Sequence, residues 1–166
     1  MQDKYLWLEE LQSTDALHWV DKQNQRTLSE WTKSNSFNEL KNRSLQFLNQ
    51  KDRLTIGTVL DNKVYHLWKD SQNPIGLFRV TGLSSFSDKP NWKLIIDLDQ
   101  YSKEQGVPTF LNHFDLLENG ERVLLYLSPE GKDARVIREW DLHKNKFVEN
   151  GFQTKLSKDS LTWIHQ

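Results

Sequence analysis

The feature that most constrains the fold of this chain is a set of short strand-like runs that are apolar on both faces. Two of them, Leu94-Ile95-Ile96 and Val123-Leu124-Leu125-Tyr126-Leu127, contain no charged residue. A sheet with one face in water would alternate apolar and polar residues, so both faces of these strands must be covered. A chain of 166 residues is long enough to bury such a core, and its 7 Trp and 8 Phe supply large apolar surfaces.

The strand-like runs form two groups of four, and the groups repeat after roughly fifty residues. Turn-forming residues stand between the runs: Asp61-Asn62 suits a tight hairpin, and Asn119-Gly120 and Glu130-Gly131 mark later joints. Four-stranded antiparallel blades that stack on one another are typical of a β-propeller. The runs are 55–60, 63–68, 76–81 and 92–98, then 109–115, 122–127, 134–142 and 147–148, with 160–164 as the start of a third group.

The pattern alone leaves a partial β-propeller and a β-sandwich open, because the two groups share little residue identity. The fold class that we predict is mainly β with an N-terminal helical segment, as a partial β-propeller of about two four-stranded blades. In a partial propeller the run 123–127 should keep one face bare, since only 160–164 of the next blade follows it. Such an apolar patch would favour self-association.

The first fifty residues are predicted to be helical. Ser13 is a suitable N-cap for a first helix, whose apolar residues recur at spacings of three and four. A second helix is predicted to begin at Ser36, because Ser36-Phe37-Asn38-Glu39 fits a capping box. We expect the two helices to form a hairpin.

Composition and charge exclude several classes of partner. The 22 basic and 23 acidic residues are interspersed and give a net charge of −1, so no nucleic-acid partner is predicted. No membrane partner is predicted either, because no apolar run approaches the roughly 18 residues that a spanning helix needs. The first residues open no signal peptide, and we expect a cytoplasmic protein, with a periplasmic location left open. The chain has no cysteine.

No catalytic, cofactor-binding or metal-binding residue is predicted, and no cofactor. The nearest match to the nucleophile elbow Gly-x-Ser-x-Gly is Gly82-Leu83-Ser84-Ser85-Phe86, which lacks the second glycine and precedes no predicted helix. His113 and Asp115 share one side of a predicted strand, but they would need further ligands to hold a metal. Trp140-Asp141 matches the Trp-Asp dipeptide of scaffold propellers without its Gly-His partner.

Three ring-bearing residues of the first group are predicted to be structural. Trp68 and Trp92 each stand at the end of a predicted strand beside a turn. His66 shares a strand face with Trp68 and is therefore expected to be a packed histidine rather than a metal ligand.

Two tryptophan-centred phrases, with the segments between and after them, resemble the amino-terminal part of the prolyl oligopeptidase family of serine peptidases. Tyr5-Leu6-Trp7-Leu8-Glu9 matches the opening phrase of the family, although Asp3-Lys4 stands where the family commonly has Asp-Pro. The second phrase holds Phe78 where the family tends to have Trp. The matching segments are Trp19-Val20, Gln23-Asn24, Asp52-Arg53, Trp68, Asp70, Asn73-Pro74, Gly76, Phe78-Arg79, 92–97, Arg138-Glu139-Trp140-Asp141, Phe147-Val148 and Gly151-Phe152.

The resemblance implies a seven-bladed propeller, preceded by a helical segment that packs on an α/β-hydrolase domain carrying the catalytic triad. It implies that the propeller covers the active site and admits only short peptides. On this expectation residues 1–50 are the helical segment, and residues 51–166 are the first two blades and the start of a third. The partners would be a hydrolase domain that is missing from this chain and, in the full enzyme, short peptides. The chain itself would then lack the triad. The alternative is a free-standing β-rich protein-interaction module.

Overall fold

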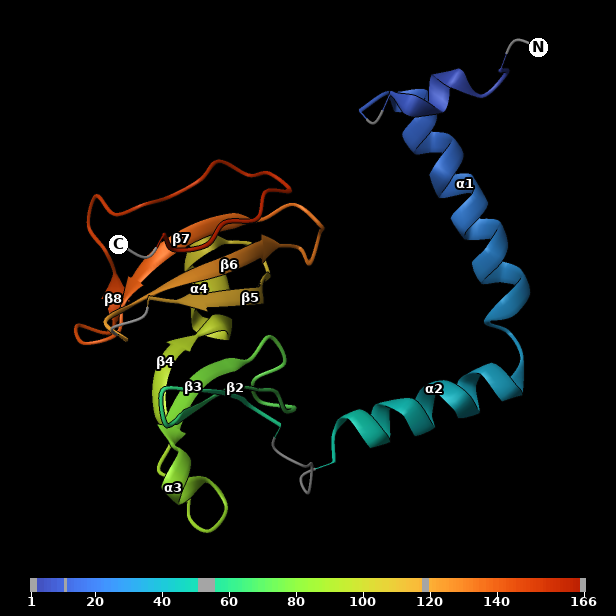
Figure 1. Ribbon diagram of the computed structural model, residues 1–166. Helices are drawn as coiled ribbons and strands as arrows, with labels where there is room; N and C mark the ends of the chain where they lie inside the picture. Colours follow the sequence, from blue (N-terminus) through green and yellow to red (C-terminus); the bar gives the residue numbers. More distant parts are fainter. Residues whose placement is uncertain (1–2, 11, 51–55, 118–119, 165–166) are drawn as a thin grey trace. The chain divides into compact units, whose positions relative to one another are not determined.

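The computed structural model describes residues 3–10, 12–50, 56–117 and 120–164. The chain divides into two compact units, residues 1–50 and residues 51–166 (Figure 1). The first unit is helical, and the second is built on two β-sheets. Asp52-Arg53, Thr55, Asn119 and the last two residues, which entered the sequence predictions, lie outside the described residues.

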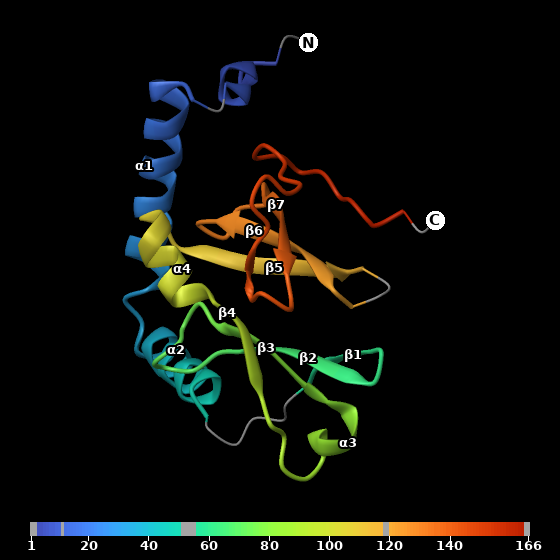
Figure 2. The same cartoon turned by 90° about the vertical axis from the view of Figure 1, so that its left-hand side faces the viewer.

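The helical unit contains a short 3-10 helix, η1 (Leu6–Glu9), and two longer helices, α1 (Thr14–Trp31) and α2 (Asn35–Leu48). Trp7 of η1 packs edge-on against Trp19 of α1, with ring centroids 6.3 Å apart. The predicted helical hairpin is wrong: α1 and α2 diverge at the turn between them and do not pack along each other (Figures 1 and 2).

A serine is the N-cap of each of the two long helices. Ser13 caps α1 as predicted, and its Oγ accepts a hydrogen bond from the backbone nitrogen of Ala16 at 3.4 Å. The predicted capping box at Ser36 is wrong, because α2 begins one residue earlier and Ser34 is its N-cap. Ser34 has an extended backbone, and its Oγ accepts from the nitrogen of Phe37 at 3.2 Å. Ser36 already lies inside the first turn, where its backbone is helical and cannot serve as the cap.

The sheet unit contains two antiparallel four-stranded sheets in which each strand pairs with the next one along the chain. Each group of four predicted strands forms one sheet, with ends shifted by a few residues. Asp61 and Asn62 have φ values of 46° and 57°, as a tight hairpin turn requires. The first sheet is β1 (Thr58–Leu60), β2 (Lys63–Trp68), β3 (Leu77–Gly82) and β4 (Lys93–Asp97); the second is β5 (Thr109–Leu116), β6 (Arg122–Pro129), β7 (Val136–Asp141) and β8 (Lys146–Phe147).

The two sheets stack with a shared apolar core between them (Figures 1 and 2). Phe78 of the first sheet meets Phe114 of the second, with ring centroids 4.8 Å apart. The alternation along β6 explains why that strand is apolar on both faces. Val123, Leu125 and Leu127 join the core between the sheets, whereas Leu124 and Tyr126 face the other side and pack with Trp163.

The C-terminal segment covers the outer face of the second sheet. Beyond β8 the chain resumes pairing with β7, and the nitrogen of Thr154 donates to the carbonyl of Ile137 at 3.1 Å. The predicted strand at 160–164 is wrong, since its residues cross the sheet and join no ladder. Trp163 Nε1 instead donates to the carbonyl of Asp115 at 3.0 Å. The expected bare face is also wrong, because Val123 to Leu127 are all buried.

A helix that the sequence patterns did not predict, α4 (Leu98–Gln105), links the two sheets. Asp97 is its N-cap and accepts from the nitrogen of Gln100 at 2.9 Å, and Gly106 ends it with a φ of 70°. Asp99 in its first turn accepts from the nitrogens of Ile75 and Gly76 at 3.2 and 2.9 Å. This short helix therefore ties the loop after β2 to the connection between the sheets.

Candidate functional site

The segment nearest to a nucleophile elbow does lie on a strand-to-helix turn. Strand β3 ends at Gly82 and a one-turn helix, α3 (Leu83–Phe86), follows it, so the prediction that no helix follows was wrong. Ser85 Oγ donates to the carbonyl of Gly82 at 3.0 Å and lies 3.1 Å from Thr81 Oγ1. Among the described residues no histidine is hydrogen-bonded to Ser84 or Ser85. A serine without a general base is not activated for nucleophilic attack.

His113 and Asp115 lie on β5, but they do not form a metal site. The imidazole of His113 packs edge-on against Tyr126, with ring centroids 5.0 Å apart. The carboxylate and carbonyl of Asp115 accept from the two nitrogens of Trp163. Within the part of the chain that the structure describes, no three His, Asp or Glu residues are arranged to hold a metal ion.

The Trp140-Asp141 dipeptide has a structural role in the second sheet. Trp140 belongs to the core between the sheets and meets Phe147 with ring centroids 4.8 Å apart. Asp141 caps the turn after β7, where its Oδ1 accepts from the nitrogens of His143 and Lys144 at 3.0 and 2.8 Å. The backbone hydrogen bond from Lys144 is the main cause that lowers the pKa of Asp141.

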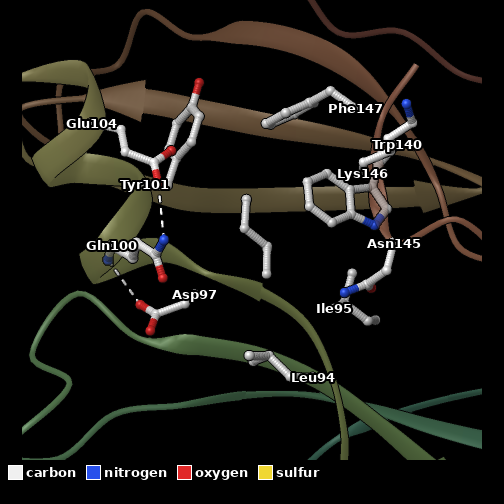
Figure 3. Close-up of a pocket in the computed structure, with 11 residues that line it drawn as sticks. Leu94, Ile95, Asp97, Gln100, Tyr101, Glu104, Trp140, Asn145, Lys146 and Phe147 are labelled. Atoms are coloured by element: carbon white, nitrogen blue, oxygen red, sulfur yellow. Dashed lines mark hydrogen bonds between the residues drawn. The ribbon is translucent and has the colours of Figure 1, made fainter. Parts of the chain in front are cut away.

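A cavity of about 410 Å³ opens beside α4, between strand β4 and the β7–β8 hairpin (Figure 3). Its polar groups mostly bond to one another or to nearby residues: Gln100 Nε2 donates to Glu104 at 3.0 Å, and the Tyr101 hydroxyl accepts from Arg138 at 3.2 Å. Its lining includes no serine, threonine or histidine. The cavity therefore lies at the junction of two packed sheets, and its lining lacks the nucleophile and the base that acyl transfer needs. Its lining residues are Leu94, Ile95, Ile96, Asp97, Gln100, Tyr101, Glu104, Trp140, Asn145, Lys146 and Phe147.

A cluster of charged and aromatic side chains lies on the face of the first sheet that points away from the second. We name it the Arg79 cluster; its members are His66, Trp68, Asp70, Arg79 and Trp92. The central carbon of the Arg79 guanidinium lies 4.8 Å from the ring centroid of Trp68 and 4.3 Å from that of Trp92. Arg79 Nε donates to His66 Nδ1 at 3.3 Å.

Strand register assembles the Arg79 cluster. His66 on β2 stands directly opposite Arg79 on β3, and Trp68 lies two residues further along the same face. Trp92 comes from the loop just before β4 and also contacts His66, with ring centroids 5.4 Å apart. The sequence patterns placed His66 and Trp68 on one face, but they did not connect that face with Arg79 and Trp92. The missing information was the pairing of β2 with β3.

Two members of the cluster have shifted pKa values. Burial, followed by the charge of Arg79, lowers the pKa of His66 to about 4, so this imidazole is neutral at pH 7. The hydrogen bond from Trp68 is the largest of several that lower the pKa of Asp70 to about 2. Asp70 accepts from Trp68 Nε1 at 2.8 Å, from the nitrogen of Gln72 at 2.9 Å, and from the backbone and side-chain nitrogens of Asn73 at 2.7 and 3.0 Å.

Residues 1–166 match the family described as prolyl oligopeptidase, N-terminal beta-propeller domain. The chain belongs to this family. The predicted family and the predicted fold class are thereby confirmed, and the propeller is favoured over the sandwich. The propeller domain is 31% identical over 170 residues to an uncharacterized peptidase of Rickettsia prowazekii and 32% identical over 167 residues to an uncharacterized peptidase of Sinorhizobium fredii.

These matches cover 96% and 99% of this propeller domain but only 24% and 23% of the two relatives. The chain therefore spans about a quarter of the length of the curated relatives it matches. Among solved structures, a post-proline cleaving enzyme from Rickettsia typhi is 32% identical with a TM-score of 0.76, covering 89% of this chain and 22% of that one. A prolyl endopeptidase structure with 15% identity and a TM-score of 0.65, covering 90% of this chain and 21% of that one, shares the fold.

Proposed function

We propose that this propeller domain works as part of a serine peptidase that cleaves short peptides, and that it controls the access of peptides to an α/β-hydrolase domain. The observation that carries the proposal is the match of residues 1–166 to the propeller family, together with two stacked blades in the structure. The relatives of known name are peptidases, and one solved relative is a post-proline cleaving enzyme. These likenesses favour the peptidase over a free-standing interaction module.

We also propose the division of the chain that the sequence predicted. Residues 51–166 would supply the first two blades and the start of a third, and residues 1–50 would be the helical segment that packs on the hydrolase domain. The apolar surface of the helices supports this role, since Trp31 and Leu40 are 71% and 64% exposed. Amphipathic helices of this kind are stabilised mainly by packing of the apolar face against a partner.

We propose that no residue of this chain is catalytic. The described serines nearest to an elbow motif, Ser84 and Ser85, have no histidine as a hydrogen-bond partner among the described residues. None of the described helices combines the length and the apolar character that a membrane-spanning segment requires. The cytoplasmic location expected from the sequence remains a proposal, which cell fractionation tests.

A domain exchange tests the proposed function. The segment of the Rickettsia typhi enzyme that corresponds to this chain is replaced by residues 1–166, and hydrolysis of a fluorogenic proline-containing peptide is measured. The expected result is a hybrid that cleaves the peptide and reacts with a fluorophosphonate probe. An equally exchanged β-propeller segment of unrelated sequence serves as the control and should give no active enzyme. A folded hybrid that labels with the probe but no longer prefers short peptides would contradict the gating role.

The chain alone gives the complementary measurement. It should neither hydrolyse the peptide nor become labelled by the fluorophosphonate, because no nucleophile, base and orienting acid are brought together. Labelling of one serine together with turnover would show that this chain carries catalytic residues after all.

A further inference from the structure

We propose that a cavity between the first strands of the two sheets binds an apolar side chain of the peptides that the domain admits. This inference deepens the proposed gating function and rests on it for the nature of the ligand. The cavity has a volume of about 240 Å³ and lies between β5 of the second sheet and strands β1 to β3 of the first, which face each other in Figure 2. Pockets for whole drug-sized ligands measure roughly 300–1,000 Å³, so this one suits a single side chain.

The lining of this cavity is mostly apolar and holds three aromatic rings in mutual contact. Tyr65 and Phe78 of the first sheet and Phe114 of the second have ring centroids 4.8 to 6.2 Å apart. Leu67 and Leu111 also line the cavity and are half-buried against the same core. A lining of this kind binds an apolar side chain because both surfaces are removed from water.

A β-bulge in β5 shapes the side of the cavity that the second sheet supplies. The register with β6 shifts between Leu111 and His113, so Asn112 is the extra residue. In a regular strand, residues three apart point to opposite faces. Leu111 and Phe114 are three apart, and yet both pack against the core between the sheets because the bulge lies between them. Bulges are over-represented next to functional sites, where they change the direction of a side chain.

The exposed part of the lining is polar and can bind the backbone of a peptide. Thr58, Asn112 and His113 are exposed residues of the lining. The side chain of Asn112 makes no hydrogen bond with any residue that the structure describes. An asparagine amide has two N–H donors and one carbonyl acceptor, so it can pair with both the carbonyl and the N–H of a bound peptide. The side chain of the bound residue would then enter the cavity.

The cavity stays accessible in a complete propeller, because the two blades that form it are both present in this chain. Strands β1 and β5 are edge strands of their sheets, so one edge of each has no neighbouring strand. The blades of a propeller stand around a central channel, and the first strand of each blade lies beside it. A peptide in this channel would therefore meet Asn112 and the cavity behind it.

The test is an NMR titration of the whole chain at pH 7 with two neutral probes, acetyl-Ala-Phe-Ala-amide and acetyl-Ala-Ala-Ala-amide. The titration follows the side-chain amide signal of Asn112 and the methyl signals of Leu111. The Phe peptide should shift both signals saturably, with an affinity in the millimolar range. The Ala peptide should bind at least about tenfold more weakly, because it has no ring to bury.

Three variants make the result specific. Thr58→Trp places a large ring at the exposed part of the lining and should abolish the saturable shift. Val59→Trp is the matched control, because Val59 is exposed on the opposite face of β1, and it should bind the Phe peptide as the unchanged chain does. Asn112→Ala leaves the apolar lining intact and should weaken binding about threefold to tenfold, because the hydrogen bonds to the peptide are lost.

The titration needs no hydrolase domain, so failure of this site can be told apart from failure of the proposed function. Equal affinities for the two peptides, or no saturable shift in the unchanged chain, would overturn the site whether or not Thr58→Trp folds. Saturable binding of the Phe peptide together with an inactive domain-exchange hybrid would support the site and contradict the proposed function. In an active hybrid, Thr58→Trp should lower kcat/KM for a Phe-containing substrate by at least about tenfold more than for its Ala counterpart.

Discussion

The helical unit and the sheet unit differ in where their apolar side chains lie. In η1, α1 and α2, Ala16 is the buried residue among those that the structure describes. Leu28 and Phe47, by contrast, are 57% and 68% exposed. In the sheet unit Phe78 is 1% exposed, and the strands share one core across two sheets. The blades therefore contain their own source of stability, while most large apolar side chains of the two long helices remain exposed.

The largest expected effect separates the two units directly. Phe78→Ala removes a ring from the core between the sheets and should lower the free energy of unfolding by about 3–5 kcal/mol. Phe47→Ala on α2 is the matched control, because its ring is mostly exposed, and it should change stability by no more than about 0.5 kcal/mol. Urea unfolding followed by near-ultraviolet circular dichroism measures both. Equal losses would mean that the helix face is buried against something in this chain.

The second prediction concerns pH and the buried imidazole of the first sheet. The pKa of His66 is lowered to about 4, below its ordinary value of 6.5, so the unfolded chain takes up a proton first as the pH falls. The contribution of His66 to the free energy of unfolding should be fully present above pH 6.5. It should decrease as the pH falls toward about 4, by at most about 3 kcal/mol. His66→Gln should flatten this part of the profile. Thermal melting at half-unit steps checks the slope, and a profile that is the same with and without His66 contradicts it.

The third prediction tests which serine begins α2. Ser34→Ala should destabilise the first turn of the helix by about 1 kcal/mol, because the nitrogen of Phe37 loses its partner. Ser36→Ala is the matched control and should cost nothing, since Ser36 lies within the helix. Carbon chemical shifts of the first turn report the helical population in each variant. If the helical population fell with Ser36→Ala and not with Ser34→Ala, the capping box predicted at Ser36 would be correct after all.

The smallest expected effect is an ion pair on the helical unit. Arg26 and Glu30 of α1 lie 3.1 Å apart with both side chains more than half exposed, so Arg26→Gln should cost about 0.3–0.5 kcal/mol and less in high salt. Arg122 and Glu139 of the second sheet are more buried. Arg122→Gln should lower the free energy of unfolding by more than Arg26→Gln does, because it removes the guanidinium partner of the Glu139 carboxylate. This loss should depend less on salt concentration, because the pair is more buried. Melting curves at low and high salt separate the two cases.

Local sequence patterns were sufficient to predict the strands, but they did not predict the segments that connect the strands. Short apolar runs and the turn residues between them predicted each strand of both sheets, because backbone pairing and burial act over a few residues. Helix α4 was missed because its first residue, Leu98, continues the apolar run of β4 and only the cap pair Asp97 and Gly106 marks its ends. The path of 160–164 was also missed, since it depends on Trp163 meeting Asp115, which is 48 residues away.

The Arg79 cluster shows the same limit at the level of a site. Its members were all visible in the sequence, and Trp68, Asp70 and Arg79 belong to one of the phrases that identified the family. Their mutual contacts follow from the register that places His66 opposite Arg79, which no local pattern contains. The absence of a catalytic set was predicted from motif spacing and stays a prediction.

Hydrogen exchange of the whole chain at neutral pH is the measurement that tests the central claim most directly. The claim is that the sheet unit is held by its own core, whereas the helices depend on a partner. The amides of β3, β6 and β7 should exchange at least about a thousandfold more slowly than those of α1 and α2, a difference of about 4 kcal/mol. Equal protection of the helices and the strands would contradict the account, because the helices would then be stabilised within this chain.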